Sequence, residues 1–334
     1  MTKEEWIRLI DGRTQELAEF LFEKAREVRH AYYGKDVYIR GLIEFTNYCK
    51  NDCYYCGIRK SNHCVSRYRL TEEEILDCCR NGYHLGFRTF VLQGGEDGYF
   101  TKDRMTKLIQ SIHTEFPDCA ITLSVGEREK GEYEAYFKAG ANRFLLRHET
   151  ATDEHYRYLH PEELSLQDRK ECLWNLRHIG YQVGSGIMVG SPGQTAEHLA
   201  EDLLFLQELQ PHMVGIGPFI PHKDTPFSTF EKGSVEKTLM MLSLIRLMNE
   251  NVLLPATTAL ATASDDGRIE GIKAGANVVM PNLSPENVRD KYALYDNKAK
   301  TGAESAEGLE ILEECVKKAD CHLDMGRGDS LVKG

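Results

Sequence analysis

FTNYCKNDCYYCG, residues 45–57, closes an apolar run that begins at Val37 and holds Cys49, Cys53 and Cys56 at C-x3-C-x2-C spacing. A loop this short lets all three thiolates turn toward one centre, where they can hold three irons of a [4Fe–4S] cluster. The fourth iron then has no protein ligand and can bind a small chelating molecule. We therefore predict a reactive cluster at this loop instead of a plain electron relay.

The other cysteines do not complete a different kind of metal site. Structural zinc normally uses a second C-x2-C or H-x3-H pair, and the chain has no such second half. Ten cysteines behind a polar N-terminus favour a reducing, cytoplasmic location over a disulfide scaffold. The remaining seven are expected to be small buried or incidental residues: Cys64, Cys78, Cys79, Cys119, Cys172, Cys315 and Cys321.

Composition excludes two classes of partner. The 334 residues are 41% hydrophobic and 28% charged, which is typical of a folded globular protein. The net charge of −11 gives no excess of basic residues to attract nucleic acid or an anionic membrane. No apolar run approaches the roughly 18 residues that a membrane span requires.

Hydrophobic periodicity predicts an α/β fold, a single (βα)8 TIM-type barrel. Residues 3–31 have helical spacing and form an N-terminal helical extension, residues 1–36. Short strands then alternate with helices, which implies parallel pairing and right-handed crossovers. The strands are expected at 37–45, 88–92, 120–124, 142–146, 182–189, 212–216, 252–257 and 277–280. The helices are expected from Thr71 onward and at 102–115, 131–139, 152–158, 166–179, 195–209, 234–250 and 264–273. The barrel spans 37–297, and a C-terminal extension, 298–334, closes one end.

Chemistry in such a barrel sits at the C-terminal ends of the strands, so each strand end deserves inspection. Gly94 and Gly95 follow the second strand and leave their backbone accessible. Arg143 and Arg147 share one face of the fourth strand, so both can point into the lumen. A buried arginine is costly without a partner, which implies an anionic ligand or carboxylate partners there. Further polar or flexible residues at strand ends are Thr122, Ser124, Gly186, Gly190, Thr257, Thr258, Met280, Tyr292 and Tyr295.

The cysteine motif, with aromatic Tyr55 before the last cysteine, resembles the signature of the radical S-adenosylmethionine (SAM) enzymes. The resemblance implies that Cys49, Cys53 and Cys56 bind a [4Fe–4S] cluster whose open iron is chelated by SAM. It implies reductive cleavage of SAM to a 5′-deoxyadenosyl radical. Residues 94–96 resemble the family's GGE motif, whose backbone holds the methionyl ammonium. The implied SAM-binding residues are Tyr55, Gly94, Gly95, Glu96, Ser124, Glu149, Arg169, Gly186 and Gly190.

Four longer phrases resemble the [FeFe]-hydrogenase maturases of the HydE type: IEFTNYC (43–49), LRHET (146–150), MVGIGPFIPH (213–222) and ANVVMPN (276–282). The resemblance implies a small anionic or organometallic substrate, a cysteine-bound iron carbonyl–cyanide complex used in H-cluster assembly. It also implies companion maturases and a reduced ferredoxin or flavodoxin-type electron donor. The implied substrate cavity comprises Thr122, Arg143, Arg147, Thr257, Thr258, Met280, Tyr292 and Tyr295.

Two alternatives stay open. A related radical SAM enzyme, similar to biotin synthase or methylornithine synthase, would act on an organic substrate in the same barrel. A non-catalytic Fe–S carrier would give no role to the glycine loops and lumen arginines. Some relatives carry a second cluster on C-terminal cysteines that include a C-x2-C pair. Here only Cys315 and Cys321 lie in that region, so we predict no second cluster.

Overall fold

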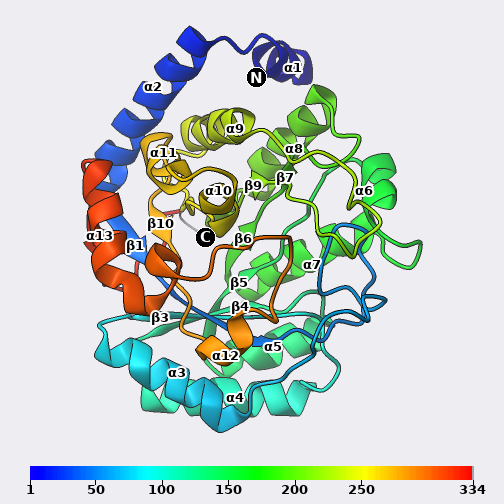
Figure 1. Ribbon diagram of the computed structural model, residues 1–334, viewed down its shortest axis with the longest axis vertical. Helices are drawn as coiled ribbons and strands as arrows, with labels where there is room; N and C mark the ends of the chain where they lie inside the picture. The colour runs from blue at the N-terminus through cyan, green and yellow to red at the C-terminus, as the bar shows by residue number, and fades with distance from the viewer. Residues whose placement is uncertain (333–334) are drawn as a thin grey trace.

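The computed structural model describes residues 1–332 and has a parallel barrel sheet at its centre, surrounded by helices (Figure 1). Six strands are hydrogen-bonded in chain order. They are β2 (Gly41–Thr46), β3 (Thr89–Gly94), β4 (Ala120–Ser124), β5 (Ala141–Leu145), β6 (Gln182–Ser185) and β8 (Met213–Val214). Every pairing among them is parallel. Because each strand is buried on both faces, these runs are nearly continuously apolar.

Single parallel bridges close the sheet into a ring. Met213 pairs with Leu253, Pro255 pairs with Val278 of β10 (Val278–Val279), and Asn282 pairs with Leu42 of β2. The expected seventh strand at 252–257 therefore exists only as isolated bridges, and Pro255 lacks the N–H that a regular ladder would use. The six strands and the two bridged segments nevertheless form a closed ring of eight parallel segments, so the predicted α/β barrel is confirmed.

Three expected strands are interrupted. The first divides at Arg40 into β1 (Asp36–Ile39) and β2, and β1 pairs instead with β10 and with β11 (His322–Asp324). The fifth and sixth continue as β7 (Met188–Val189) and β9 (Gly217–Pro218), which pair with each other. A Cβ at Gly186 would lie 1.9 Å from the carbonyl oxygen of Gly215, so the backbone segments after β6 and β8 approach closely where they leave the main sheet.

The helices follow the expected alternation. Thr71 and Glu74 form a reciprocal capping box at the start of α3, and the Thr195 side chain caps α8. Helices around the ring are α3 (Glu72–His84), α4 (Lys102–Glu115), α5 (Lys130–Lys138), α6 (Asp153–Leu159), α7 (Leu166–Ile179), α8 (Ala196–Leu209), α9 (Val235–Met248) and α11 (Gly267–Lys273). Shorter or terminal ones are α1 (Lys3–Asp11), α2 (Gln15–Tyr33), α10 (Thr258–Ala263), α12 (Glu286–Arg289) and α13 (Leu309–Lys318). In Figure 1, α1 and α2 run along the outside beside α8 and α9.

The two ends of the barrel differ. We use the name open end for the side of the barrel where the strands terminate and the cysteine loop leaves β2. We call the other the closed end, because residues 326–332 cover it. Arg143 of β5 contacts the Arg327 carbonyl and the Asp329 carboxylate, and Arg40 reaches the Gly328 carbonyl.

Candidate functional site

The cysteine loop is fixed to the exits of β2 and β3. The backbone N–H of Lys50 donates to the Glu96 carbonyl (2.9 Å), and that of Gly95 donates to the Thr46 carbonyl (3.2 Å). A Cβ at Gly95 would lie 2.2 Å from the Tyr48 carbonyl oxygen and 2.8 Å from Cβ of Cys49. Only glycine allows this approach, so the residue after β3 helps to set the position of the first cysteine.

The three thiols of the loop are half-buried and close to one another. Burial raises the pKa of Cys49, raises that of Cys53 well above its usual value and raises that of Cys56 to about 12, with neighbouring cysteines adding to the rise at Cys53 and Cys56. A bound cation reverses this balance, because metal coordination stabilises the thiolate. Within residues 1–332 no three His, Cys, Asp or Glu side chains gather around a single metal ion. Thiolates on separate irons of a cluster do not converge in that way.

The GGE segment meets the loop after β4 instead of standing free. Glu96 is buried, and its Oε1 accepts from the backbone N–H of Glu127 (3.1 Å). A Cβ at Gly126 would lie 2.1 Å from Cγ of Glu96. Lys50 forms an ion pair with Glu96 (3.3 Å). The segment therefore joins the cysteine loop to the end of β4, where Ser124 lies half-buried.

Buried Arg169 and half-buried Glu127 form an ion pair beside the cysteine loop. Nε of Arg169, on α7, lies 2.5 Å from Oε1 of Glu127, and Nη1 donates to the Arg147 carbonyl (3.1 Å). Burial raises the pKa of Glu127, although the charge of Arg169 opposes the rise. Sequence reasoning selected Arg169 and missed Glu127. Its position three residues beyond the end of β4 was the only available signal.

Glu149 lies near Tyr55, the residue of the loop that precedes Cys56. Glu149 has φ +64°, a left-handed conformation that costs a non-glycine residue about 1 kcal/mol or more. Its N–H donates to the Gly186 carbonyl (3.1 Å), and its carboxylate lies 3.1 Å from Nη2 of Arg147. Burial raises the pKa of Tyr55 well above its usual value, with further contributions from Glu149, Cys53 and Cys56. Tyr55, Glu149, Cys53 and Cys56 therefore lie close to one another.

His160 is a second residue that the sequence did not reveal. Its Nε2 lies 3.1 Å from the Tyr55 hydroxyl, and its ring stacks on Tyr156 at a centroid distance of 4.0 Å. Burial, together with the charge of Arg169, lowers its pKa to about 3. The imidazole is therefore neutral at physiological pH and orients Tyr55 through an uncharged hydrogen bond.

Several charged atoms at the open end are buried without a hydrogen-bond partner, although most lie within ion-pair distance of an opposite charge. They are Glu96 Oε2, Glu127 Oε1, Arg147 Nε and Nη2, Glu149 Oε2 and Arg169 Nε. Buried polar atoms are nearly always hydrogen-bonded, so a ligand that carries both positive and negative groups would supply the hydrogen bonds that these ion pairs leave unmade. The amine, carboxylate and ribose of SAM have that character, and the residues present fit it.

The predicted substrate-cavity residues divide between the two ends. Arg147, Tyr292 and Tyr295 lie at the open end: Cys56 contributes to the raised pKa of Tyr292, and Arg147 moderates that of Tyr295. Thr257 and Thr258 occupy the start of α10, where their hydroxyls donate to the Ile216 carbonyl (3.1 Å) and to Glu304 (2.7 Å). Gly190, at the end of β7, has φ +76° and packs against Gly233.

The expectation that Arg143 and Arg147 face one cavity was wrong. Strand β5 ends at Leu145, so the alternation that would align the two arginines stops between them. Arg143 lies at the closed end, with a buried side chain bonded to Asp329 (2.7 Å), Thr89 (3.1 Å) and Gln182 (3.2 Å). Its counter-charge is a carboxylate of the same chain.

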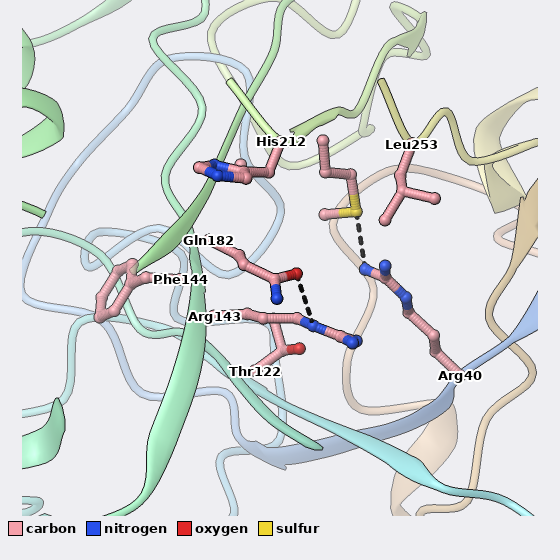
Figure 2. Close-up of a pocket in the computed structure, with 9 residues that line it drawn as sticks. Arg40, Thr122, Arg143, Phe144, Gln182, His212 and Leu253 are labelled. Carbon is pink, nitrogen blue, oxygen red and sulfur yellow. Dashed lines mark hydrogen bonds between the residues drawn. The ribbon is translucent and has the colours of Figure 1, made fainter. Parts of the chain in front are cut away.

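Figure 2 shows Arg143, Arg40 and Thr122 around a cavity of about 10 Å³ at this closed end. That volume is close to what one water molecule requires. The hydroxyl of Thr122 faces it without a hydrogen-bond partner. Met280 packs nearby with Leu145 and Met213 in an apolar cluster. Thr122 and Arg143 are therefore not brought together with the cysteines.

Three features together define a radical SAM enzyme. They are the barrel, the three-cysteine loop after β2, and the buried charged groups without hydrogen bonds at the open end. The radical SAM superfamily matches residues 43–206, and the chain belongs to this superfamily. Its [4Fe–4S] cluster and SAM are the cofactors that the residues at the open end fit.

Within that superfamily, the chain is 45% identical over 280 residues to the [FeFe] hydrogenase maturase subunit HydE of Thermotoga maritima, covering 84% of this chain and 80% of that protein. It is 31% identical over 290 residues to 3-methylornithine synthase of Methanosarcina acetivorans, covering 86% and 81%. The solved structure of methylornithine synthase (PylB) superposes with a TM-score of 0.87 at 29% identity, over 97% of this chain and 94% of that one. The predicted family, fold and enzyme class are confirmed.

Proposed function

We propose that this radical SAM enzyme acts in [FeFe]-hydrogenase maturation, on a cysteine-bound iron carbonyl–cyanide precursor of the H-cluster. One observation carries the proposal: the 45% identity to HydE extends over most of both chains, against 31% for 3-methylornithine synthase. The matched region therefore spans strand ends and loops, where a barrel enzyme keeps its specificity.

When bound, the cluster and SAM supply a 5′-deoxyadenosyl radical through one-electron reduction. The protein's own residues bind, orient and exclude water. Arg169 with Glu127 and Arg147 with Glu149 offer alternating charges to the amino-acid and ribose groups of SAM. Tyr55 is held by neutral His160 beside the cysteine loop. Arg147 is paired with Glu149 and has two buried nitrogens without a hydrogen bond, and it is the proposed contact for an anionic substrate.

The remaining roles belong to the same proposal. Gly94, Gly95 and Glu96 form the lip of the SAM site, with Ser124, Gly186 and Gly190 at neighbouring strand ends. Thr257, Thr258, Tyr292 and Tyr295 line the substrate side. The electron donor is a reduced ferredoxin or flavodoxin-type protein, companion maturases precede or follow this step, and the enzyme works in the cytoplasm. None of the helices within residues 1–332 has the length and apolarity needed to cross a bilayer.

The decisive experiment is anaerobic reconstitution with iron, sulfide and SAM, followed by addition of a synthetic cysteine-bound iron carbonyl–cyanide complex under dithionite. The expected result is 5′-deoxyadenosine, consumption of the complex and, with companion maturases, activation of apo-hydrogenase. A Cys49→Ala/Cys53→Ala/Cys56→Ala variant is the control and should give no 5′-deoxyadenosine. Retained cleavage in that variant contradicts the cluster assignment.

Methylornithine synthase chemistry is the second candidate, since the fold match to that enzyme spans nearly the whole chain. Formation of 3-methylornithine by the reconstituted enzyme, without turnover of the iron complex, would establish it. Iron analysis also tests the cluster count. More than about four irons per chain would contradict the prediction that Cys315 and Cys321 hold no second cluster.

A further inference from the structure

A strap of chain, residues 290–299, crosses the open end of the barrel. It lies between α12 and the C-terminal helices, and no regular helix or strand is assigned within it. Its backbone is hydrogen-bonded to both ends of the cysteine loop, to the loop at Pro221 and to helix α10. The contacts are Asn47 Nδ2 to the Lys291 carbonyl (2.7 Å), Gly57 N–H to the Leu294 carbonyl (2.8 Å), Asp296 N–H to the Pro221 carbonyl (3.1 Å) and Ala299 N–H to Thr262 Oγ1 (3.0 Å).

The strap packs directly on the cysteine loop. A Cβ at Gly57, the residue after Cys56, would lie 2.2 Å from the carbonyl oxygen of Ala293. Tyr292 is buried, and burial raises the pKa of its hydroxyl well above the usual value, while Gln93 of β3, just before the GGE segment, partly offsets the rise. Movement of the strap would therefore uncover both the cysteine loop and the GGE segment, residues 94–96.

One side chain of the strap enters the barrel. Asn297 takes a left-handed conformation (φ +55°), and the following residue, Lys298, turns inward. Its ammonium forms an ion pair with Oε1 of Glu44 on β2 and donates to the Tyr292 carbonyl (3.1 Å). The ammonium also lies 4.9 Å from the centroid of the Tyr292 ring. Lys298 thus connects the strap, its tyrosine and the barrel wall.

Glu44 makes this contact energetically important. Its side chain is 0% exposed, and Oε2 accepts from Asn282 Nδ2 (2.8 Å). A buried carboxylate needs a counter-charge, and removal of one partner of a buried pair is strongly destabilising. Among the ion pairs of the described chain, Lys298 is the cation that faces Glu44. The counter-charge is present only when the strap lies across the barrel.

We propose that Lys298 is a positioning residue of the radical SAM site: its ion pair with buried Glu44 latches the strap over the open end and holds Tyr292 against the cysteine loop. The latch excludes water from the bound ligands, and its opening gives them a route of entry. The inference rests on the radical SAM function of the site and is independent of which substrate is used.

The residue directly after the strap provides a matched control. Lys300 pairs with Asp290, but both side chains are about half-exposed, at 48% and 67%. An exposed pair contributes little, whereas the buried one should determine whether the strap stays closed. Lys298→Met and Lys300→Met remove the same charge from positions two residues apart, the first within the strap and the second directly after it.

The first test is hydrogen–deuterium exchange on the full chain without cofactors. In Lys298→Met the amides of residues 291–299 should exchange about tenfold faster or more, while α3, α4 and α7 keep their protection. Lys300→Met should exchange like the parent. Unchanged exchange of the strap in Lys298→Met would overturn the proposal. If that variant does not fold, Glu44→Gln provides the same comparison from the barrel side.

The second test uses reconstituted enzyme. In Lys298→Met the KM for SAM should rise at least about tenfold, with a smaller change in kcat, because positioning and closure are lost and not the cluster. Lys298→Arg should restore most of the affinity. Loss of kcat at unchanged KM and unchanged strap exchange would assign Lys298 to another role. Absence of any SAM cleavage in the parent would instead refute the enzyme function and leave the exchange result intact.

Discussion

Arg143 and Arg147 are four residues apart, yet they belong to opposite ends of the barrel and have opposite roles. At the closed end Arg143 donates hydrogen bonds to Gln182, Thr89, the Arg327 carbonyl and Asp329, so its charge is satisfied by the fold. At the open end Arg147 forms an ion pair with Glu149 (3.1 Å), but its Nε and Nη2 are buried without a hydrogen bond. A satisfied charge is structural, whereas one left unsatisfied by the protein is available to a ligand.

The contrast extends to what covers each end. The C-terminal segment covers the closed end and brings a carboxylate to a buried arginine. The strap covers the open end and brings an ammonium to a buried carboxylate. The cavity behind the first cover is about 10 Å³, which leaves no room for a substrate. The second cover lies over the cysteine loop. The predictions below test whether the two ends separate function from stability.

The largest effect is expected at Arg169. Arg169→Met leaves the buried Oε1 of Glu127 without its partner, which should lower the free energy of unfolding by about 3–5 kcal/mol and reduce SAM cleavage at least about 100-fold. Urea denaturation and quantification of 5′-deoxyadenosine measure the two quantities. Arg143→Met is the matched variant at the closed end. It should lose stability but keep its affinity for SAM, and equal loss of affinity in both would erase the distinction.

Gly95→Ala should prevent normal loading of the cluster. The added Cβ would lie 2.2 Å from the Tyr48 carbonyl oxygen, so the cysteine loop must shift. Iron content and the visible absorption of the reconstituted protein should fall to less than about half of the parent's, since the three thiolates no longer share their geometry. Gly131→Ala is the control, because nothing lies within 4 Å of its Cβ. It lies in α5 and should stabilise the protein by about 0.5–1 kcal/mol with full loading.

Asp329→Asn should weaken the closed end without affecting catalysis. Burial tends to raise the pKa of Asp329, but hydrogen bonds from Arg327 and Arg143 outweigh it and hold the pKa well below the usual range. The carboxylate therefore contributes stability above about pH 4, and this contribution is lost as pH falls through the lowered pKa. Because Asp329 is 45% exposed, solvent screening limits the loss at pH 7 to about 1 kcal/mol. A fall in kcat with unchanged unfolding would contradict this assignment.

An effect that is negligible at pH 7 and grows as pH falls involves one histidine at each end. Burial lowers the pKa of His160 to about 3 at the open end and that of His212 to about 4 at the closed end. Nδ1 of His212 accepts from the Val183 N–H (3.0 Å), which requires the neutral ring. Below about pH 6.5 the unfolded chain binds these protons and the folded chain does not, so stability falls as pH falls.

Each histidine should contribute a slope of about 1.4 kcal/mol per pH unit between pH 6.5 and its lowered pKa. His160→Gln and His212→Gln should each reduce the slope of unfolding free energy against pH by that amount. Only His160→Gln should also change SAM cleavage, because its ring contacts Tyr55. Parallel slopes in parent and variants would show that the rings are not held neutral.

Much of the fold was predictable because local signals were strong. Helices 102–115 and 166–179 and the strand 120–124 were predicted to the residue, since amphipathic spacing and capping residues mark their limits. The split at Arg40 and the missing regular strand at 252–257 were not predicted. Both depend on ring closure between distant segments, which periodicity does not encode.

The sequence by itself determined the cysteine loop, the barrel and the end of the barrel at which the chemistry occurs, because spacing and strand order are local properties of the chain. Only the tertiary structure decided which charged residues lie together at that end. Arg143 lost its predicted role to a carboxylate 186 residues away in the chain, and Glu127, His160 and Lys298 gained roles that no motif marked. The physical reason is that the cost of a buried charge depends on its partners in space, and those partners come from parts of the chain that only folding brings together.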